Sequence, residues 1–232
     1  MLDGLPIWFW YLVVIAGTAF LVVRHLPRVA RRRTQQRVPA ATIARPEEPP
    51  AMTRIEMPEI LAWLQTRAPR SPDLWHILPD LNWDHAEHLH PILLWVVRQP
   101  DCDAATAIDI LSLMSDDVTL DLASGGTRWA RSGFDPNDSD EVRLLRAICE
   151  RSEGGGFAGP VLKQTMWPST HANHQHLEML QGVLAKIEAE GRSVPFPLPV
   201  KLLSAPVPDD VRPARTPVRL DDDAILVPLD MA

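Results

Sequence analysis

Residues 101–114 read DCDAATAIDILSLM, and this stretch decides the fold class. Its apolar residues recur at helical spacing, and small alanines at 104, 105 and 107 permit close packing against another helix. An aspartate at 101 or 103 can offer its carboxylate to the unpaired backbone N–H groups of a first helical turn. The stretch therefore predicts a buried helix over residues 104–114.

The same three- and four-residue spacing of apolar side chains recurs on both sides of this helix. It predicts further helices over residues 57–67, 72–78 and 91–98, from residue 138 or 139 to the glycines at 154–156, and over residues 170–190. Pro72 suits the first turn of its helix, and Pro91 is interpreted as the start of the third one. We therefore expect a mainly α domain over residues 57–191.

Residues 118–131 are ambiguous. The alternation in Val118-Thr119-Leu120-Asp121-Leu122 is typical of a strand, and Gly125-Gly126 could turn a short β-hairpin. Ser115 and Asp116 could equally cap another helix. Both alternatives stay open at this point.

A hydrophobic segment precedes the domain. Residues 5–23 contain no charged side chain, and at about 1.5 Å per residue a helix of this length matches the hydrocarbon core of a bilayer. Trp8, Trp10 and Tyr11 crowd one end, and arginines follow the other end. A cleaved signal peptide has the reverse order, with its basic residues first. The pattern predicts a transmembrane helix in contact with inner-membrane lipid.

The charge distribution orients this helix. Residues 1–45 hold seven arginines and one acid, a net charge of +6, whereas the remainder holds 16 basic and 29 acidic residues, a net charge of −13. Because arginine collects in cytoplasmic segments, we expect residues 1–4 outside and everything after the helix in the cytoplasm of a bacterium. The acidic domain argues against nucleic-acid binding, since phosphates would repel it.

Two proline-rich stretches flank the predicted domain. Residues 24–56 begin with the arginines and continue as a mixture of prolines with small and polar residues, which predicts a juxtamembrane segment and tether. Residues 192–232 are again rich in proline, and we expect a flexible C-terminal tail there. Cys102 and Cys149 are the only cysteines, and a cytoplasmic setting favours free, buried thiols.

The centre of the domain resembles a bacterial family, domain of unknown function 4274. The similarity rests on Leu81-Asn82-Trp83-Asp84, on the proline-led Pro91-Ile92-Leu93-Leu94-Trp95, on Gln99-Pro100-Asp101-Cys102-Asp103 and on Thr106-Ala107. It covers about residues 58–165. It implies a compact helical bacterial domain and no catalytic residues. We interpret Asn82, Trp83, Asp84, Pro100, Cys102, Asp103 and Thr106 as scaffold residues.

Histidines stand where the chain departs from this pattern. His85, His88 and His90 have the spacing His-x-x-His-x-His, which returns at His171, His174 and His176. On a helix, His171 and His174 would share one face, while His176 would instead flank the leucine stripe. A zinc site would require His171, His174 and one of His85 or His88 to converge.

The sequence therefore favours a function in binding over one in catalysis. We expect a membrane-anchored, cytoplasmic protein-interaction domain, an adaptor or regulator that binds an unidentified protein and could neutralise a toxin. The alternative is a membrane-tethered, metal-dependent hydrolase that uses the two His-x-x-His-x-His segments. No phosphate-binding or serine-nucleophile motif occurs in the sequence.

Overall fold

The computed structural model describes residues 51–126, 139–166 and 169–232, and this part of the chain is mainly helical with one small sheet. The elements are β1 (Met52–Glu56), α3 (Met57–Thr66), α4 (Pro72–Ile77), η1 (Leu78–Asp80), η2 (Trp83–His85), α5 (Ala86–Val97), α6 (Ala104–Leu113), α7 (Asp116–Ala123), α8 (Asp140–Glu153), α9 (Thr170–Ala189), α10 (Val200–Ser204), β2 (Arg219–Asp221), β3 (Ala224–Pro228) and η5 (Leu229–Met231). No helix in these ranges is long and apolar enough to span a bilayer, and the predicted membrane helix over residues 5–23 lies outside them.

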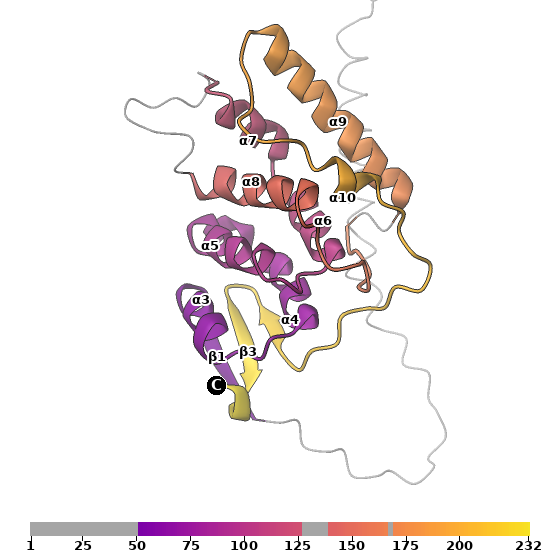
Figure 1. Cartoon of the computed structure of the whole chain (residues 1–232). Helices are drawn as coiled ribbons and strands as arrows, with labels where there is room; N and C mark the ends of the chain where they lie inside the picture. Colours follow the sequence, from indigo (N-terminus) through magenta and orange to yellow (C-terminus); the bar gives the residue numbers. More distant parts are fainter. Residues whose placement is uncertain (1–50, 127–138, 167–168) are drawn as a thin grey trace, which may run out of the picture. The chain divides into compact units, whose positions relative to one another are not determined.

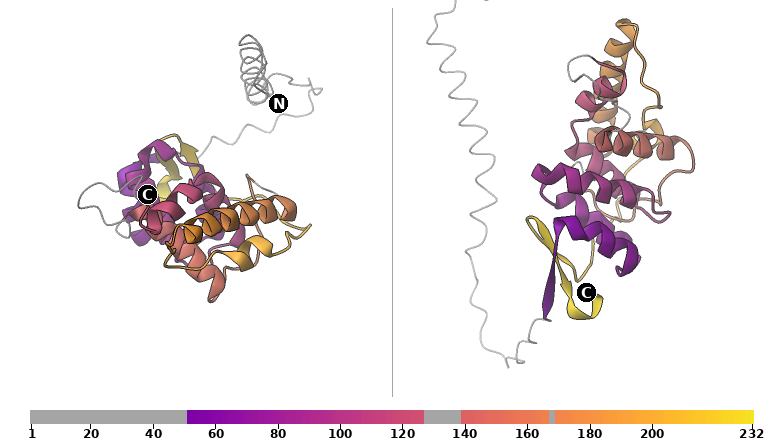
Figure 2. Two further views of the ribbon diagram at one scale, coloured as in Figure 1. Left: turned by 90° about the horizontal axis from the view of Figure 1, so that it is seen from above. Right: turned by 90° about the vertical axis from the view of Figure 1, so that its left-hand side faces the viewer.

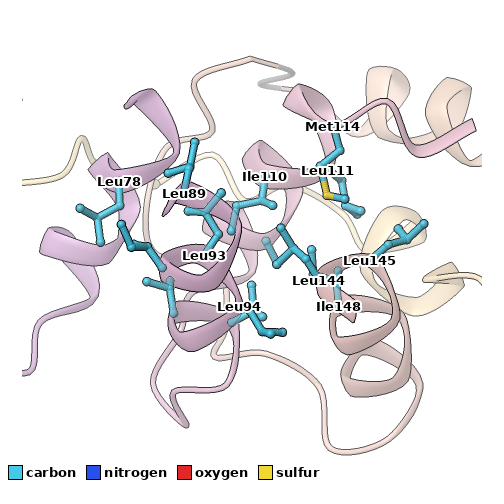
Figure 3. Packing of buried hydrophobic residues seen from close by; sticks show 14 of the residues in the cluster. Leu78, Leu89, Leu93, Leu94, Ile110, Leu111, Met114, Leu144, Leu145 and Ile148 are labelled. Atoms are coloured by element: carbon cyan, nitrogen blue, oxygen red, sulfur yellow. The ribbon is translucent and has the colours of Figure 1, made fainter. Parts of the chain in front are cut away.

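The elements stack in layers within the unit Pro49–Ala232. Figures 1 and 2 show the sheet with α3 at one end, α5 and α8 in the middle, and α7, α9 and α10 at the other end. The core between the layers consists of aliphatic side chains, and Figure 3 shows it formed by Leu78, Leu89, Leu93, Leu94, Ile110, Leu111, Met114, Leu144, Leu145 and Ile148. These residues come from η1, α5, α8, and α6 with its C-cap Met114, so the two middle helices and α6 carry the centre of the fold.

The stretch DCDAATAIDILSLM, residues 101–114, forms the predicted helix. In α6, the Asp103 side chain accepts a hydrogen bond of 2.8 Å from the Ala105 N–H, as expected of an N-cap. Ser71 and Ser169 cap α4 and α9 in the same way. At α8 the N-cap is Ser139, but its side chain makes no capping hydrogen bond.

The third predicted helix begins earlier than expected. Helix α5 starts at Ala86, so Pro91 lies inside it rather than at its first turn. A proline within a helix removes one backbone hydrogen bond, which made residue 91 look like a boundary. Leu89, Ile92, Leu93 and Val96 are all buried on the inner side of α5, and this packing stabilises a helix that continues through the proline.

The ambiguous segment is a helix. Residues 116–123 form α7, which excludes a hairpin over that range, while residues 127–131 lie outside the described residues. The buried side chains of Asp116, Thr119, Leu120 and Ala123 have helical spacing, and they outweigh the apparent alternation. Gly125, at a φ of +80°, ends the helix instead of turning a hairpin.

The proline-rich C-terminal stretch is part of the fold, which corrects the predicted tail over residues 192–232. Strand β3 is the central strand of the sheet, antiparallel to β1 and β2, and its Ile225 and Val227 are fully buried. Helix α10 packs against α8 and α9. Pro199 precedes α10 and Pro228 is the last residue of β3, so neither proline lies in the interior of its element.

The end of the predicted tether also belongs to the domain. Residues 52–56 form β1, whose Ile55 faces Ile225 of β3 in the register. The predicted domain, residues 57–191, is therefore too short at both ends. The two ends of the domain meet in this sheet, and the indole N–H of Trp63 donates a hydrogen bond of 2.8 Å to the Met231 carbonyl.

Candidate functional site

An extended segment, residues 161–166, crosses the surface beside α4 and α6. We call it the 161–166 segment. Its backbone pairs with Arg212: the Arg212 N–H donates to the Val161 carbonyl at 3.0 Å, and the Lys163 N–H donates to the Arg212 carbonyl at 2.8 Å. The C-terminal stretch therefore supports the segment through two backbone hydrogen bonds like those between neighbouring strands.

Two buried carboxylates of α6 fix the segment from below. Asp103 accepts a hydrogen bond of 2.9 Å from the Val161 N–H, in addition to capping α6. Asp109, which is 1% exposed, accepts hydrogen bonds from the Thr165 N–H at 3.0 Å and from the Thr165 hydroxyl at 2.6 Å. Ionised carboxylates are strong acceptors, so these contacts hold the segment in one conformation.

The imidazole of His76 lies between the segment and α6. Its Nε2 is 3.0 Å from the Lys163 carbonyl, which can only accept, so Nε2 carries the proton and donates. In the neutral ring, Nδ1 then accepts from the Thr106 hydroxyl at 2.9 Å. Both nitrogens are occupied in this arrangement, and His76 acts as a connector between α4, α6 and the segment.

Gln164 belongs to the segment, and the oxygen of its side-chain amide makes no hydrogen bond. The residue is 3% exposed, and its Oε1 has no hydrogen-bond partner among the described residues. A buried acceptor without a partner costs about 1–3 kcal/mol of stability. Trp75 Nε1 in the neighbouring helix α4 and the amide of Asn173 are buried in the same way without a partner among the described residues.

Gln164 lines two cavities. The first, which we call the Asp80 cavity, has a volume of about 370 Å³ and is lined by His76, Asp80, Gln164 and Pro213 among others. The second, which we call the Asp209 cavity, has a volume of about 390 Å³ and is lined by Gln164, Thr170 and Asp209 among others. Both volumes are within the range of ligand sites in proteins.

Asp80 gives the first cavity its charge. Partial burial raises the pKa of the Asp80 carboxyl above its ordinary value, the nearby Asp109 carboxylate raises it further, and His76 opposes both effects. Asp80 is nevertheless an exposed residue, and Lys163 lines the same cavity, so the cavity holds both an acidic and a basic side chain.

Exposed apolar side chains stand at both ends of the segment. Val161 is 55% exposed and Met166 is 42% exposed. Together with the cavities beside Gln164, they form a surface with apolar contacts at its edges and hydrogen-bond acceptors at its centre. This combination is typical of sites that bind proteins.

The first scaffold residues of the sequence motif, Asn82 and Trp83, hold η2 in place. Asn82 donates to Asp223 at 2.9 Å and accepts from the Asp84 N–H, so it joins η2 to the turn between β2 and β3. The Trp83 indole N–H donates to the Pro79 carbonyl at 2.8 Å. These contacts position the chain that leads out of α4 and η1.

The second half of the motif supports the site more directly. Asp103 and Thr106 contact Val161 and His76 as described above. The Pro100 carbonyl accepts a hydrogen bond of 3.0 Å from Arg151 of α8.

Cys102 is fully buried, and burial raises the pKa of its thiol to about 12. Burial likewise raises the pKa of the Cys149 thiol, so both cysteines are protonated at neutral pH.

The histidine segments do not assemble into one site. His85 Nε2 lies 3.2 Å from an Asp223 carboxylate oxygen, and His88 Nε2 lies 3.8 Å from Glu87. His171 is exposed, and His174 Nε2 is 3.4 Å from the Ser204 carbonyl. Within residues 51–126, 139–166 and 169–232, no group of three or more His, Cys, Asp or Glu side chains has the geometry to hold a metal ion.

His176 has a structural partner instead. The sequence places it beside the leucine stripe of α9, and there it is 4% exposed with its Nε2 at 2.5 Å from Asp116 Oδ2. Asp116 begins α7, so this pair joins α7 to α9. The periodicity of apolar residues alone does not indicate a buried polar pair of this kind.

Comparisons with family models, with curated proteins and with solved structures gave no significant match. The resemblance to domain of unknown function 4274 therefore stays a prediction.

Proposed function

We propose that the chain is a bacterial single-pass inner-membrane protein whose cytoplasmic domain binds another protein as an adaptor or regulator. The binding surface is the 161–166 segment with the two cavities beside Gln164. One observation carries the proposal: a rigidly held surface segment presents exposed Val161 and Met166 on either side of a buried amide oxygen that lacks a partner among the described residues.

The way in which the segment is held supports binding. Asp103 and Asp109 fix its backbone from below, and Arg212 pairs with it from the side. A surface that is already ordered loses little conformational entropy when a partner docks. Exposed apolar side chains on such a surface then add directly to affinity, because their burial removes them from water.

The charge of the domain supports a basic partner. Residues 46–232 carry 16 basic and 29 acidic side chains, a net charge of −13. Opposite charge accelerates association and excludes acidic competitors. A basic toxin that the domain neutralises would be one such partner.

The buried polar groups support binding rather than catalysis. Both nitrogens of His76 are hydrogen-bonded, and Asp109 accepts hydrogen bonds from Thr165. These side chains hold loops in place, and a general base needs an accessible lone pair near its substrate. The buried polar side chains of the domain therefore fit a structural role.

Site-specific photocrosslinking in living cells tests the binding surface. The full chain would carry p-benzoylphenylalanine in place of Val161 or Met166, with Met179 and Leu229, both exposed apolar residues elsewhere, as matched controls. We expect one discrete crosslinked protein from positions 161 and 166 and none from positions 179 and 229. Equal crosslinking from all four positions, or none from the segment, would contradict the proposal.

The membrane anchor rests on the sequence of residues 5–23 and needs its own test. We expect the full chain to remain in the membrane fraction after alkaline carbonate extraction, and a variant lacking residues 5–23 to leave it. A C-terminal reporter should be active as a cytoplasmic green fluorescent protein fusion and inactive as an alkaline phosphatase fusion. The opposite reporter pattern would overturn the orientation.

A further inference from the structure

We infer that the domain pairs with a second copy of itself through β1, so that the two copies form one continuous antiparallel sheet. This pairing goes beyond the proposed function, because β1 and the 161–166 segment share no residue. The strand order β1-β3-β2 makes β1 an edge strand. The other edge, β2, has three residues and follows Pro217 closely, whereas β1 has five residues and no proline.

The backbone of β1 is open on its outer side. The N–H of Met57, directly after β1, donates a hydrogen bond of 2.9 Å to the Asp223 carbonyl, directly before β3. Successive residues of a strand point their backbone groups to opposite sides, so the odd-numbered residues of β1 face β3 and the even-numbered ones face away. The outward N–H groups, which hydrogen-bond to no described residue, belong to Met52, Arg54 and Glu56.

The charges on this edge are complementary to themselves. Arg54 and Glu56 lie on one face of β1, with side chains 43% and 55% exposed. An antiparallel pair of β1 strands centred on Ile55 places Arg54 of each copy opposite Glu56 of the other copy. A pair centred on Arg54 would instead place two arginines opposite each other. Opposite charges stabilise a cross-strand pair and like charges destabilise it, which favours the register centred on Ile55. There the Glu56 N–H of one copy donates to the Arg54 carbonyl of the other.

A cavity of about 340 Å³ lies beside β1. Its lining includes Thr53, Arg54 and Ile55 of β1 together with Ala62 and Thr66 of α3, so α3 leaves space along the strand. The same patch on both copies, with each residue of one contacting its counterpart region on the other, is the arrangement of a two-fold dimer. Two copies anchored in one bilayer, as the proposed function expects, also meet at high local concentration, which favours pairing through a short strand.

Copurification of two differently tagged full-length copies tests the pairing. Glu56→Lys makes both charged positions of β1 basic, and Arg54→Glu makes both acidic. We expect each variant to copurify with itself about tenfold less than wild type does, because two pairs of like charges then oppose each other. The two variants expressed together should copurify like wild type, since every cross-strand pair again has opposite charges. Self-pairing of both variants at the wild-type level, or no recovery in the mixture, would overturn the inference.

An exposed ion pair on α8 supplies the matched control. Asp140→Lys and Arg143→Glu change the charge in the same way at a pair that lies outside β1. We expect these variants to copurify with themselves and with each other at the wild-type level. The same loss and recovery in this control set would reduce the effect to general charge attraction and overturn the pairing through β1.

Cysteine crosslinking tests the register without a charge reversal. Full-length Arg54→Cys and Glu56→Cys copies, expressed together, should form a disulfide with each other when the lysate is oxidised with copper phenanthroline, because opposite Cβ atoms lie about 4.5–5.5 Å apart. Thr53→Cys, on the other face of β1, should form none with either. No disulfide between positions 54 and 56, or an equal one from position 53, would overturn the inference. Neither readout involves positions 161 and 166, so photocrosslinking there tests the proposed function separately.

Discussion

Asp103 accepts a hydrogen bond of 2.9 Å from the backbone N–H of Val161, and this contact ties the N-terminus of α6 to the proposed binding segment. The same carboxylate caps α6 through Ala105. One buried side chain therefore organises both the most strongly predicted helix and the surface beside it.

Asp103→Ala should remove the helix cap and the anchor of the segment together. We expect it to lower the free energy of unfolding by about 2–4 kcal/mol, because a cap contributes about 1 kcal/mol and a charged hydrogen bond about 1.5–3 kcal/mol. Urea denaturation of the full chain in detergent micelles, followed by tryptophan fluorescence, measures it. Asp210→Ala, at an exposed turn, is the control and should change stability by less than about 0.5 kcal/mol. A similar small change for Asp103→Ala would show that the contact contributes little.

Gln164→Met should make the isolated protein more stable. The two side chains are similar in size, and methionine removes the buried oxygen that has no partner among the described residues. We expect a gain of about 1–2 kcal/mol in unfolding free energy, together with loss of partner crosslinking at position 166. Gln175→Met, on the exposed face of α9, should change neither quantity. A loss of stability in Gln164→Met would show that the amide is satisfied in the folded protein and would remove the signal on which the site rests.

The thiols of Cys102 and Cys149 should be inert in the folded protein. Both are fully buried, and burial raises the pKa of each thiol, that of Cys102 to about 12. Ellman's reagent at pH 7.5 should label neither cysteine in the native chain and both in urea, since the thiolate is the reactive form. Rapid labelling of one cysteine under native conditions would indicate an opening of the core around α6 or α8.

The Asp73–Arg212 pair should make stability depend on acidity. The Arg212 guanidinium, at 2.8 Å from Asp73 Oδ2, lowers the pKa of the Asp73 carboxyl below its ordinary value of 3.8. A lowered pKa means that the ionised form stabilises the fold at higher pH, and that this contribution is lost as pH falls through the folded-state pKa. The stability difference between wild type and Asp73→Asn should therefore be full above about pH 5 and shrink below pH 3.8.

Thermal unfolding of both proteins between pH 2.5 and pH 7 measures this difference. Asp140→Asn, which disrupts an exposed pair with Arg143, is the control and should have a small effect at every pH. A constant difference between wild type and Asp73→Asn across this range would contradict the linkage.

Much of the helical framework could be predicted from the sequence because its signals are local. The periodic apolar residues of α6 and the carboxylate of Asp103 lie within one short stretch, and both behave as predicted. The start of α5 could not be placed, since Pro91 is a strong local boundary signal and only packing of Leu89 and Ile92 overrides it.

The sheet and the site depend on contacts between distant parts of the chain. Strand β3 is a short apolar run between an acidic turn and a proline, and nothing in it indicates that its partner is the stretch 52–56. Asp109, a lone carboxylate in an apolar helix, was a usable signal for a buried polar contact. Gln164 carried no signal, because the cavities beside it are lined by α4, the start of α9 and the C-terminal stretch together.

The most direct test is photocrosslinking from position 166 of the full chain in cells, with the equally exposed position 179 of α9 as the control. We expect one discrete crosslinked protein from position 166 and none from position 179. No crosslinked protein from position 166, or equal crosslinking from both positions, would contradict the claim that the 161–166 segment binds a partner protein.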